Sequence, residues 1–293
     1  KELPKVADAI RQLDVSSCIL GMEVELWEGG HHFPREAIAG KIHRKGEPET
    51  EGIVATVFEC VYLNGKDLHK EDEEVRRRAL DSIKFPQSTE GVPDTKLALN
   101  KLPTHRGRGR EEIEKLMRKV INAPGSEGAV LKRVDAKYYL DGNSRMEWFK
   151  YHKTSRVFGI VYEIQETKKK GIFNYLYALD YGKYKVKQSQ QVKVGDKSYI
   201  KVGKTFSTDT VVRKGQIIEI EIETLNFTVD ERDDSIQIGC WCPRFLRIAS
   251  ERKTPDSVDE AVKRAKVNGV LSEKKIDKDG ETHYLEKRNL EDS

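Results

Sequence analysis

Apolar residues in the first part of the chain form two runs that are typical of β-strands. Residues 16–27 form an apolar run, interrupted by Glu23 and Glu25, that ends at Glu28-Gly-Gly30. This pattern predicts a strand followed by a hairpin turn. Residues 53–63 are rich in β-branched and aromatic side chains and are followed by the turn signal Asn64-Gly65. They predict a second, central strand.

Apolar residues at helical spacing follow these strands. Residues 68–81 carry a narrow apolar stripe among many charges, which predicts an exposed helix. Residues 111–122 repeat the pattern until Pro124-Gly125, which predicts the end of a second helix. The string Arg106-Gly-Arg-Gly-Arg110 before that helix fits a phosphate-binding loop or a solvated loop. Strands and helices in this order predict an α+β domain.

After residue 153 the pattern changes to short strands separated by Gly, Asn, Lys and Asp. The predicted strands are 157–164, 175–180, 191–194, 217–225 and 236–238. Five short strands predict a small Greek-key β-barrel of the oligonucleotide-binding (OB) type, whose faces and loops bind nucleic acid. The lysines of this part, which include Lys168-Lys-Lys170, favour a polyanionic partner.

These patterns divide the 293 residues into three parts. Residues 1–153 are predicted to form the α+β domain and residues 154–253 the five-stranded OB-fold barrel. Residues 254–293 are predicted to form a helix at 258–266 and a charged tail. A chain of this length exceeds the usual size of one domain, which agrees with the division.

Charge and cysteine content exclude several classes of protein. Charged residues make up 35% of the chain, with a net charge of +4. No apolar run approaches eighteen residues and no signal peptide is recognisable, so we expect an intracellular protein of the cytoplasm or nucleus with no membrane partner. Four cysteines are too few for a disulfide framework, and Cys240-Trp-Cys242 lacks a second ligand pair for zinc.

Two short segments carry the candidate chemistry. Glu127-Gly-Ala-Val-Leu-Lys132 and Trp148-Phe-Lys-Tyr-His-Lys153 are both predicted strands that bring a carboxylate and cations toward one site. A carboxylate with several lysines suits a nucleotide phosphate and its metal ion. Each of these residues also fits a purely structural role. Glu127 fits a surface ion pair. Phe58 fits a core position and Trp148 fits packing.

In order and spacing, these segments resemble the ATP-dependent DNA ligases of the nucleotidyltransferase superfamily. Ser17-Cys-Ile-Leu-Gly-Met-Glu-Val resembles the family strand Ile-Leu-Asp-Gly-Glu-Val, with departures at Gly21 and Met22. Phe58-Glu-Cys-Val-Tyr-Leu-Asn-Gly-Lys-Asp-Leu68 resembles Phe-Asp-Leu-Leu-Tyr-Leu-Asn-Gly-x-Asp-Leu. The resemblance implies that residues 1–153 are the C-terminal part of an adenylation domain, which precedes an OB-fold domain. It also implies nick sealing through a lysyl-AMP and a DNA-adenylate.

The resemblance implies a role for each matched residue. The implied nucleotide-binding residues are Glu23 at the ribose, Phe58 at the adenine, Lys132, Lys150, Arg247 and Lys253. The implied catalytic residues are Lys132, Lys150 and Lys153, with His152 where the family has its second lysine. Glu59 and Glu127 are implied Mg²⁺ ligands. The implied DNA-binding residues are Lys168, Lys169, Lys170 and Lys204. Arg247 and Lys253 match an Arg-x-Asp-Lys segment imperfectly, because one residue is inserted and Glu251 replaces the aspartate.

The Lys-x-Asp-Gly motif that carries the family's nucleophile does not occur in residues 1–293. The leading hypothesis is a DNA ligase of replication, repair and recombination whose nucleophile lies upstream, so that this chain as given does not adenylate itself. It implies ATP and Mg²⁺ as cofactors, nicked duplex DNA as partner and a monomer, with a sliding clamp or another repair protein as a further partner. The alternatives are a noncatalytic ligase-like nucleic-acid binder and an mRNA capping guanylyltransferase.

Overall fold

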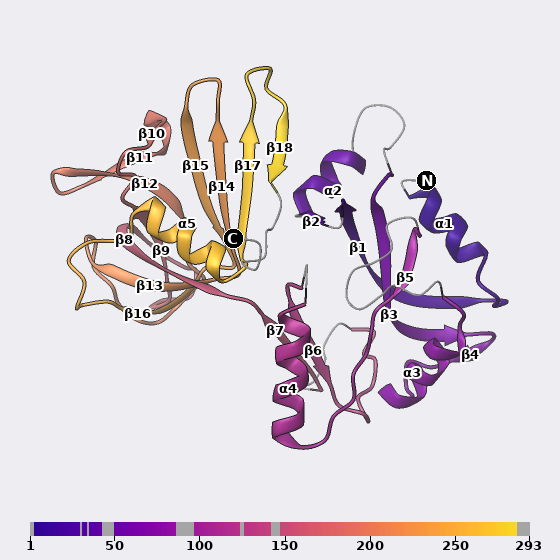
Figure 1. Ribbon diagram of the computed structural model, residues 1–293. Helices are drawn as coiled ribbons and strands as arrows, with labels where there is room; N and C mark the ends of the chain where they lie inside the picture. Colours follow the sequence, from indigo (N-terminus) through magenta and orange to yellow (C-terminus); the bar gives the residue numbers. More distant parts are fainter. Residues whose placement is uncertain are drawn as a thin grey trace. The chain divides into compact units, whose positions relative to one another are not determined.

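The structure is a computed structural model that describes residues 3–29, 31–33, 35–42, 50–85, 97–123, 126–141 and 147–285. The chain divides into two compact units, Lys1–His152 and Lys153–Ser293. The first combines a sheet with helices, and the second consists of sheets and one α-helix (Figure 1). The predicted α+β class is confirmed at this level. None of the described helices is long and apolar enough to cross a membrane.

The first unit contains a five-stranded sheet. Its strands are β1 (Cys18–Glu28), β2 (His31–Phe33), β3 (Ile53–Leu63), β4 (Lys66–Asp67) and β5 (Leu99–Lys101). β1 and β3 lie side by side and antiparallel at its centre, and β5 runs parallel to β3 (Figure 1). Asn64 and Gly65 have φ angles of 48° and 87°, which form the two-residue turn that their sequence predicts. The predicted turn at Gly30 lies outside the described residues.

Helices cover one face of this sheet. They are α1 (Pro4–Arg11) and α3 (Glu73–Ser82). The unit also contains α2 (Arg35–Ile42) and α4 (Gly109–Ile121). Val57 and Cys60 of β3 pack in one core with Val6 of α1 and Leu80 of α3. Because side chains alternate along a strand, the other face displays Glu23 and the residues near it. The predicted helix stop at Pro124-Gly125 lies outside the described residues.

Two charged segments of this unit, 71–77 and 106–110, form ion pairs. The helix expected over 68–81 is α3, but it is not the exposed helix that was predicted, since Arg76 is wholly buried and Arg77 is 8% exposed. The Arg106–Arg110 string forms surface ion pairs, because Arg106 lies 3.0 Å from Glu74 and Arg110 lies 2.6 Å from Glu114.

The two chemistry-bearing segments form a separate antiparallel ribbon of β6 (Gly128–Lys132) and β7 (Trp148–His152). Lys132 is paired with Trp148, and Val130 is paired with Lys150. Side chains of cross-strand pairs share a face, so Lys132, Trp148 and Lys150 lie on one face of the ribbon. The prediction that both segments are strands is confirmed.

The second unit contains a six-stranded and a five-stranded sheet. The first, in the order β11-β12-β9-β8-β13-β16, comprises β8 (Ser155–Glu166), β9 (Phe173–Leu179), β11 (Gln191–Val194), β12 (Lys197–Lys204), β13 (Ile217–Ile222) and β16 (Arg244–Ile248). The second, in the order β10-β15-β14-β17-β18, comprises β10 (Lys185–Val186), β14 (Thr224–Asp230), β15 (Ser235–Trp241), β17 (Leu271–Ile276) and β18 (Thr282–Leu285). A short 3₁₀ helix, η1 (Gln188–Gln190), precedes β11.

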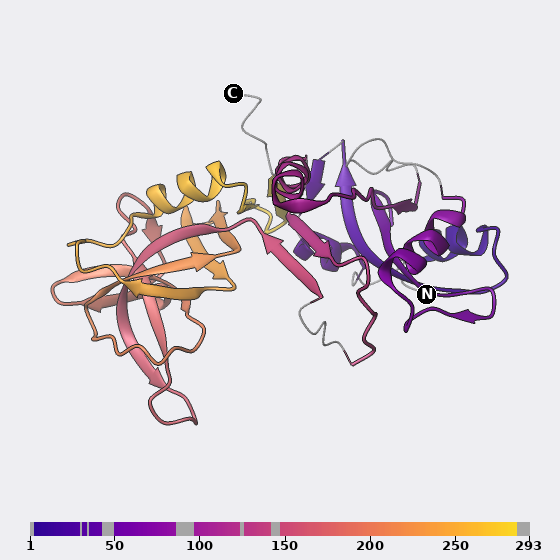
Figure 2. The same cartoon turned by 90° about the horizontal axis from the view of Figure 1, so that it is seen from below.

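A shared core joins the two sheets. It contains Tyr175 and Ile220 of the first sheet with Leu225 and Phe227 of the second. Helix α5 (Val258–Val267) adds Val258 and lies across one side of the unit (Figure 2).

The end of the chain differs from the prediction of a helix and a charged tail. The helix is present, and a capping box between Ser257 and Glu260 fixes its start. Residues 271–285, however, form β17 and β18, and β17 pairs in parallel with β14. Three of the six residues of β17 are charged, so the sequence carries no strand pattern here. Residues 286–293 of the predicted tail lie outside the described residues.

Candidate functional site

Lys132, at the end of β6, is the centre of a charge cluster in the first unit. Its Nζ lies 2.9 Å from Glu59 Oε2 and 3.3 Å from Glu73 Oε1. The same nitrogen lies 4.0 Å from the ring centroid of Trp148 and 5.9 Å from that of Phe58. The structure thus brings together three residues that the sequence singled out, Lys132, Glu59 and Phe58, with Glu73, which it did not.

Arg76 of α3 stands behind these carboxylates. Its Nε donates to Glu59 Oε1 at 3.1 Å, and its Nη2 donates to Glu59 Oε2 at 3.3 Å and Glu73 Oε2 at 2.5 Å. Its Nη1 donates to the backbone carbonyls of Glu71 and Ala136 at 2.7 and 2.8 Å. A guanidinium has five N–H donors, so every donor of this wholly buried side chain has an acceptor.

The two carboxyl groups of the cluster differ in proton affinity. Burial raises the pKa of Glu59, but hydrogen bonds from Arg76 and the nearby Lys132 outweigh burial and hold the pKa below its usual value. Burial raises the pKa of Glu73 above its usual value even though Lys132 opposes this shift. Glu59 therefore remains ionised, and Glu73 takes up a proton first as the pH falls.

A second group of carboxylates lies near Glu25 of β1. Burial raises the pKa of Glu25, a hydrogen bond of 2.7 Å from the Thr56 hydroxyl opposes this, and the charges of Glu23 and Glu127 raise the pKa further. Glu23 and Glu127 are exposed, and both act electrostatically on this one half-buried carboxyl group. Two residues far apart in the sequence are therefore close to the same part of the first unit.

The departure from the ligase motif at Gly21 has a structural explanation. A Cβ atom at Gly21 would lie 3.1 Å from Glu59 Cβ and 3.2 Å from Cε2 of the Phe58 ring. These distances are shorter than ordinary van der Waals contacts. The glycine therefore lets the Phe58 ring approach β1, and a larger residue would require Phe58 or Glu59 to move. We have no such account for Met22.

Gly128 gives a first prediction, because its Cβ position is blocked by backbone. A Cβ there would lie 1.9 Å from the carbonyl oxygen of Tyr151, on the facing strand. Gly128→Ala should therefore separate β6 from β7 at this end and lower the free energy of unfolding by about 1–3 kcal/mol. Urea unfolding measures the loss. Gly239→Ala, in strand β15, is the control for clash, since Gly239 has no positive φ and a Cβ there would lie 3.8 Å from its nearest neighbour, in ordinary contact. Equal losses in both variants would contradict the clash.

Other predicted nucleotide-binding residues belong to the second unit. Lys253, one of them, is exposed, and Lys153, which was predicted to be catalytic, is the first residue of this unit. Arg247 donates from Nε to Glu219 at 2.5 Å and from Nη2 to Glu251 at 2.6 Å. The hydrogen bonds from Arg247 lower the pKa of Glu251 to about 2. Arg247 and Glu251 thus form an ion pair where the family motif has its arginine and aspartate.

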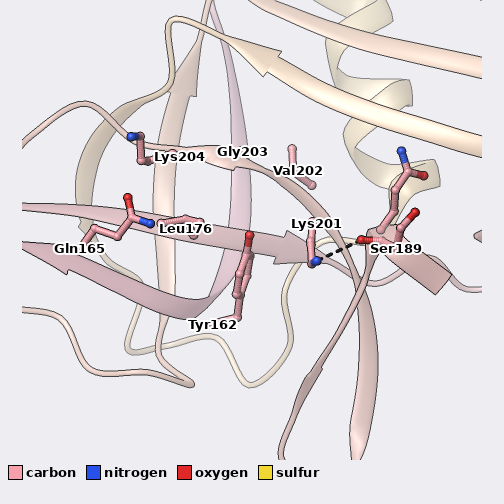
Figure 3. Close-up of a pocket in the computed structure, with 9 residues that line it drawn as sticks. Tyr162, Gln165, Leu176, Ser189, Lys201, Val202, Gly203 and Lys204 are labelled. Atoms are coloured by element: carbon pink, nitrogen blue, oxygen red, sulfur yellow. Dashed lines mark hydrogen bonds between the residues drawn. The ribbon is translucent and has the colours of Figure 1, made fainter. Parts of the chain in front are cut away.

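The predicted DNA-binding lysines are all exposed residues of the second unit. Lys168, Lys169 and Lys170 lie between β8 and β9, and Lys204 ends β12. Lys204 and Lys201 line a groove of about 420 Å³ together with Tyr162 (Figure 3). Lys201 donates to the carbonyl of Ser189 at 3.0 Å, as Figure 3 shows.

Metal-ligand geometry in the described ranges singles out one other place. It lies beside the β17–β18 turn and consists of Asp277, Glu281 and His283. Their ligand atoms lie within 4.8 Å of one another. Glu59 and Glu127 are not in such a group. Nucleotide-bound Mg²⁺ requires only one or two carboxylates with the phosphates, so their predicted role stays a prediction.

Comparison with known proteins supports the resemblance. The family model "ATP dependent DNA ligase domain" matches residues 1–152, more than half of the chain. DNA ligase 4 of Candida albicans is 35% identical over 104 residues, which are 36% of this chain and 10% of that protein. DNA ligase 4 of Phaeosphaeria nodorum is 33% identical over 138 residues, 47% of this chain and 13% of that protein. The chain thus spans about a tenth of the length of these relatives.

One solved structure gives the same result for the fold. The structure described as "Pmar-Lig_Pre." has a TM-score of 0.50 and 15% identity, and the match covers 80% of this chain and 51% of that chain. The one described as "Pmar-Lig_PreS3" has a TM-score of 0.48, 15% identity and coverages of 79% and 51%. The resemblance found in the sequence is therefore confirmed, and this chain belongs to the ATP-dependent DNA ligase family.

Proposed function

We propose that this chain provides the nucleotide-phosphate and DNA-binding parts of an ATP-dependent DNA ligase that seals nicks in duplex DNA. The observation that carries the proposal is the position of Lys132, whose ammonium group lies beside the aromatic rings of Phe58 and Trp148. An ammonium group beside half-buried aromatic rings suits a ligand that combines a base with phosphates. The match of the family model to this unit supports the same assignment.

In this proposal, Phe58 stacks on the adenine and Glu23 binds the ribose. Lys132 exchanges Glu59 and Glu73 for a phosphate oxygen, and Lys150 on the same ribbon face adds a second cation. Positive charge at this place stabilises the negative charge that develops on the phosphate oxygens during AMP transfer. Mg²⁺, when bound, would add charge of the same sign. Glu127 is the more accessible carboxylate for it, since its side chain is exposed and Glu59 is buried.

The remaining roles belong to the second unit in the same proposal. Its two sheets with one core are proposed to be an OB-fold barrel that binds the duplex through its exposed lysines. Arg247 and Lys253 are proposed to act on the leaving pyrophosphate, and Lys153 on a phosphate. AMP passes from ATP to a lysine and then to the 5′ phosphate of the nick. A Lys-x-Asp-Gly lysine for the first step is not part of residues 1–293.

A noncatalytic nucleic-acid binder is the second candidate. One observation favours it, because two carboxylates already neutralise the charge of Lys132. In that case Lys132 would remain in its ion pairs when nucleotide is added.

Lys132→Met distinguishes the two candidates. If Lys132 binds phosphate, the variant should bind ATP with Mg²⁺ about tenfold more weakly than the parent chain, because a hydrogen bond to a charged group contributes about 1.5 kcal/mol or more. Isothermal titration calorimetry measures the affinity. Lys115→Met removes the same charge from an exposed position of α4 and should not change it. Equal ATP affinity in the parent chain and Lys132→Met would favour the noncatalytic binder.

A further inference from the structure

Arg76 is a buried charge to which neither the sequence motifs nor the proposed mechanism gives a role. It is 0% exposed and belongs to α3, outside the two strands that carry the candidate chemistry. Its side chain contacts the same two carboxylates that hold Lys132. Glu59 and Glu73 therefore each lie between two cations, one buried and one at the edge of the site.

The charges of this cluster balance only when Arg76 is present. Glu59 and Glu73 carry two negative charges when ionised, and Arg76 and Lys132 carry two positive charges. Without Arg76, two buried carboxylates would share one ammonium group, and attraction at low dielectric would draw it toward them. Arg76 thus controls both the position of Lys132 and how strongly the carboxylates hold it.

The shape of the guanidinium matters as much as its charge. Arg76 fixes Glu59 through two nitrogens and Glu73 through one, and the backbone carbonyls of Glu71 and Ala136 fix the guanidinium itself. A lysine has three donors on one nitrogen and no planar fork, so it would restore the charge without the geometry. This difference separates a positioning role from mere charge balance.

We propose that Arg76 is a positioning residue that acts through Glu59 and Glu73 to hold the ammonium group of Lys132 beside the Phe58 and Trp148 rings. The importance of this position for ligand binding rests on the proposed function. The position itself exists without nucleotide and is testable without it.

Arg76→Lys is the main variant, and Arg77→Lys is its matched control. Arg77 is the next residue of α3, is 8% exposed and lies 3.1 Å from Asp81, so it tests the same substitution in the same helix outside the cluster. Thermal unfolding shows whether each variant folds. If Arg76→Lys does not fold, Glu73→Gln replaces it, since this change removes one of the two carboxylates between Arg76 and Lys132 with little change of shape.

The NMR signal of the Lys132 ε-methylene group reports the position. In the full chain labelled with [¹³Cε]lysine, Lys132→Arg identifies the signal by its disappearance. Because Nζ lies 4.0 Å from the Trp148 ring centroid, the ring current should shift this signal away from those of exposed lysines. Arg76→Lys should return it toward the exposed position, and Arg77→Lys should leave it in place. Glu73→Gln should move it in the same direction as Arg76→Lys.

Two outcomes separate this proposal from the proposed function. A folded Arg76→Lys or Glu73→Gln chain with an unmoved Lys132 signal overturns the positioning role, whatever the affinity for ATP. A moved signal supports the role even if the parent chain does not bind ATP, and that failure would count against the proposed function alone. If both proposals hold, Arg76→Lys should also weaken ATP binding, and Arg77→Lys should not.

Discussion

Glu59→Gln is expected to lower the free energy of unfolding by about 3–5 kcal/mol at neutral pH, because it removes one partner from a buried ion-pair network. Glu59 is 2% exposed and accepts hydrogen bonds from Arg76 and Lys132. The glutamine keeps the shape but leaves two cations with the single carboxylate of Glu73. Urea unfolding followed by circular dichroism, fitted to the transition of the first unit, measures the loss.

The control for this prediction is Glu114→Gln, which breaks an exposed ion pair with Arg110 in α4. Surface pairs contribute little, so the expected change is within about 0.5 kcal/mol. Similar losses in the two variants would mean that the Glu59 pairs do not stabilise the fold.

The effect of Glu59→Gln should depend on pH. Since the pKa of Glu59 is lowered in the folded chain, its charge stabilises the fold above its usual pKa of 4.5. This contribution is lost as the pH falls through the lower folded pKa. The difference between the parent chain and the variant should therefore be full above pH 4.5 and shrink below it. Glu73 has the opposite shift, so the comparison between the two chains, and not either curve alone, isolates Glu59.

Local patterns were sufficient to predict much of the fold. The strand predicted at 53–63 has the same bounds as β3, because a run rich in β-branched and aromatic residues followed by Asn64-Gly65 fixes both its length and its end. The strand expected at 217–225 is two strands, β13 and β14, which belong to different sheets. No glycine, proline, asparagine or aspartate lies between the two strands, so the sequence carries no turn signal for this change of sheet.

Strands with few apolar residues were missed. β12 contains Lys197, Ser198, Lys201 and Gly203 among its eight residues, and its central position between β9 and β11 comes from pairing that a local pattern does not encode. β17 was assigned to a charged tail for the same reason. In both strands, long-range pairing overrides weak local preference.

The candidate site was predictable only as far as each residue lay in a recognisable motif. Lys132, Glu59 and Phe58 belong to such motifs, and the structure brings them together. Arg76 and Glu73 lie in a highly charged helix whose sequence resembles a solvated surface, since four of the seven residues at 71–77 are acidic and two are arginines. Their burial depends on packing against β3 and on the approach of β6, which lies far from them in the sequence, so no local pattern could have indicated it.

Binding of duplex DNA should lose about a hundredfold in affinity between 50 and 200 mM salt if the four predicted lysines each contact one phosphate. Each neutralised phosphate releases counterions, so four contacts give a slope of about −3.6 in the logarithmic plot of affinity against salt. Replacing Lys168, Lys169, Lys170 and Lys204 together by glutamine should flatten this slope toward zero and weaken binding at low salt. Fluorescence anisotropy with a labelled nicked duplex measures both quantities.

The control for the salt prediction must remove the same charge from elsewhere in the second unit. Glutamine at the exposed Lys197, Lys263, Lys266 and Lys278 also lowers the formal net charge from +4 to 0. If the DNA contacts are local, this variant keeps most of the slope, because counterion release depends on the phosphates that are touched and not on the total charge. Equal slopes in the two variants would show that binding is a general effect of charge. A flat response of the parent chain would remove the DNA-binding role from these lysines, while the phosphate site at Lys132 would still stand on the ATP titration.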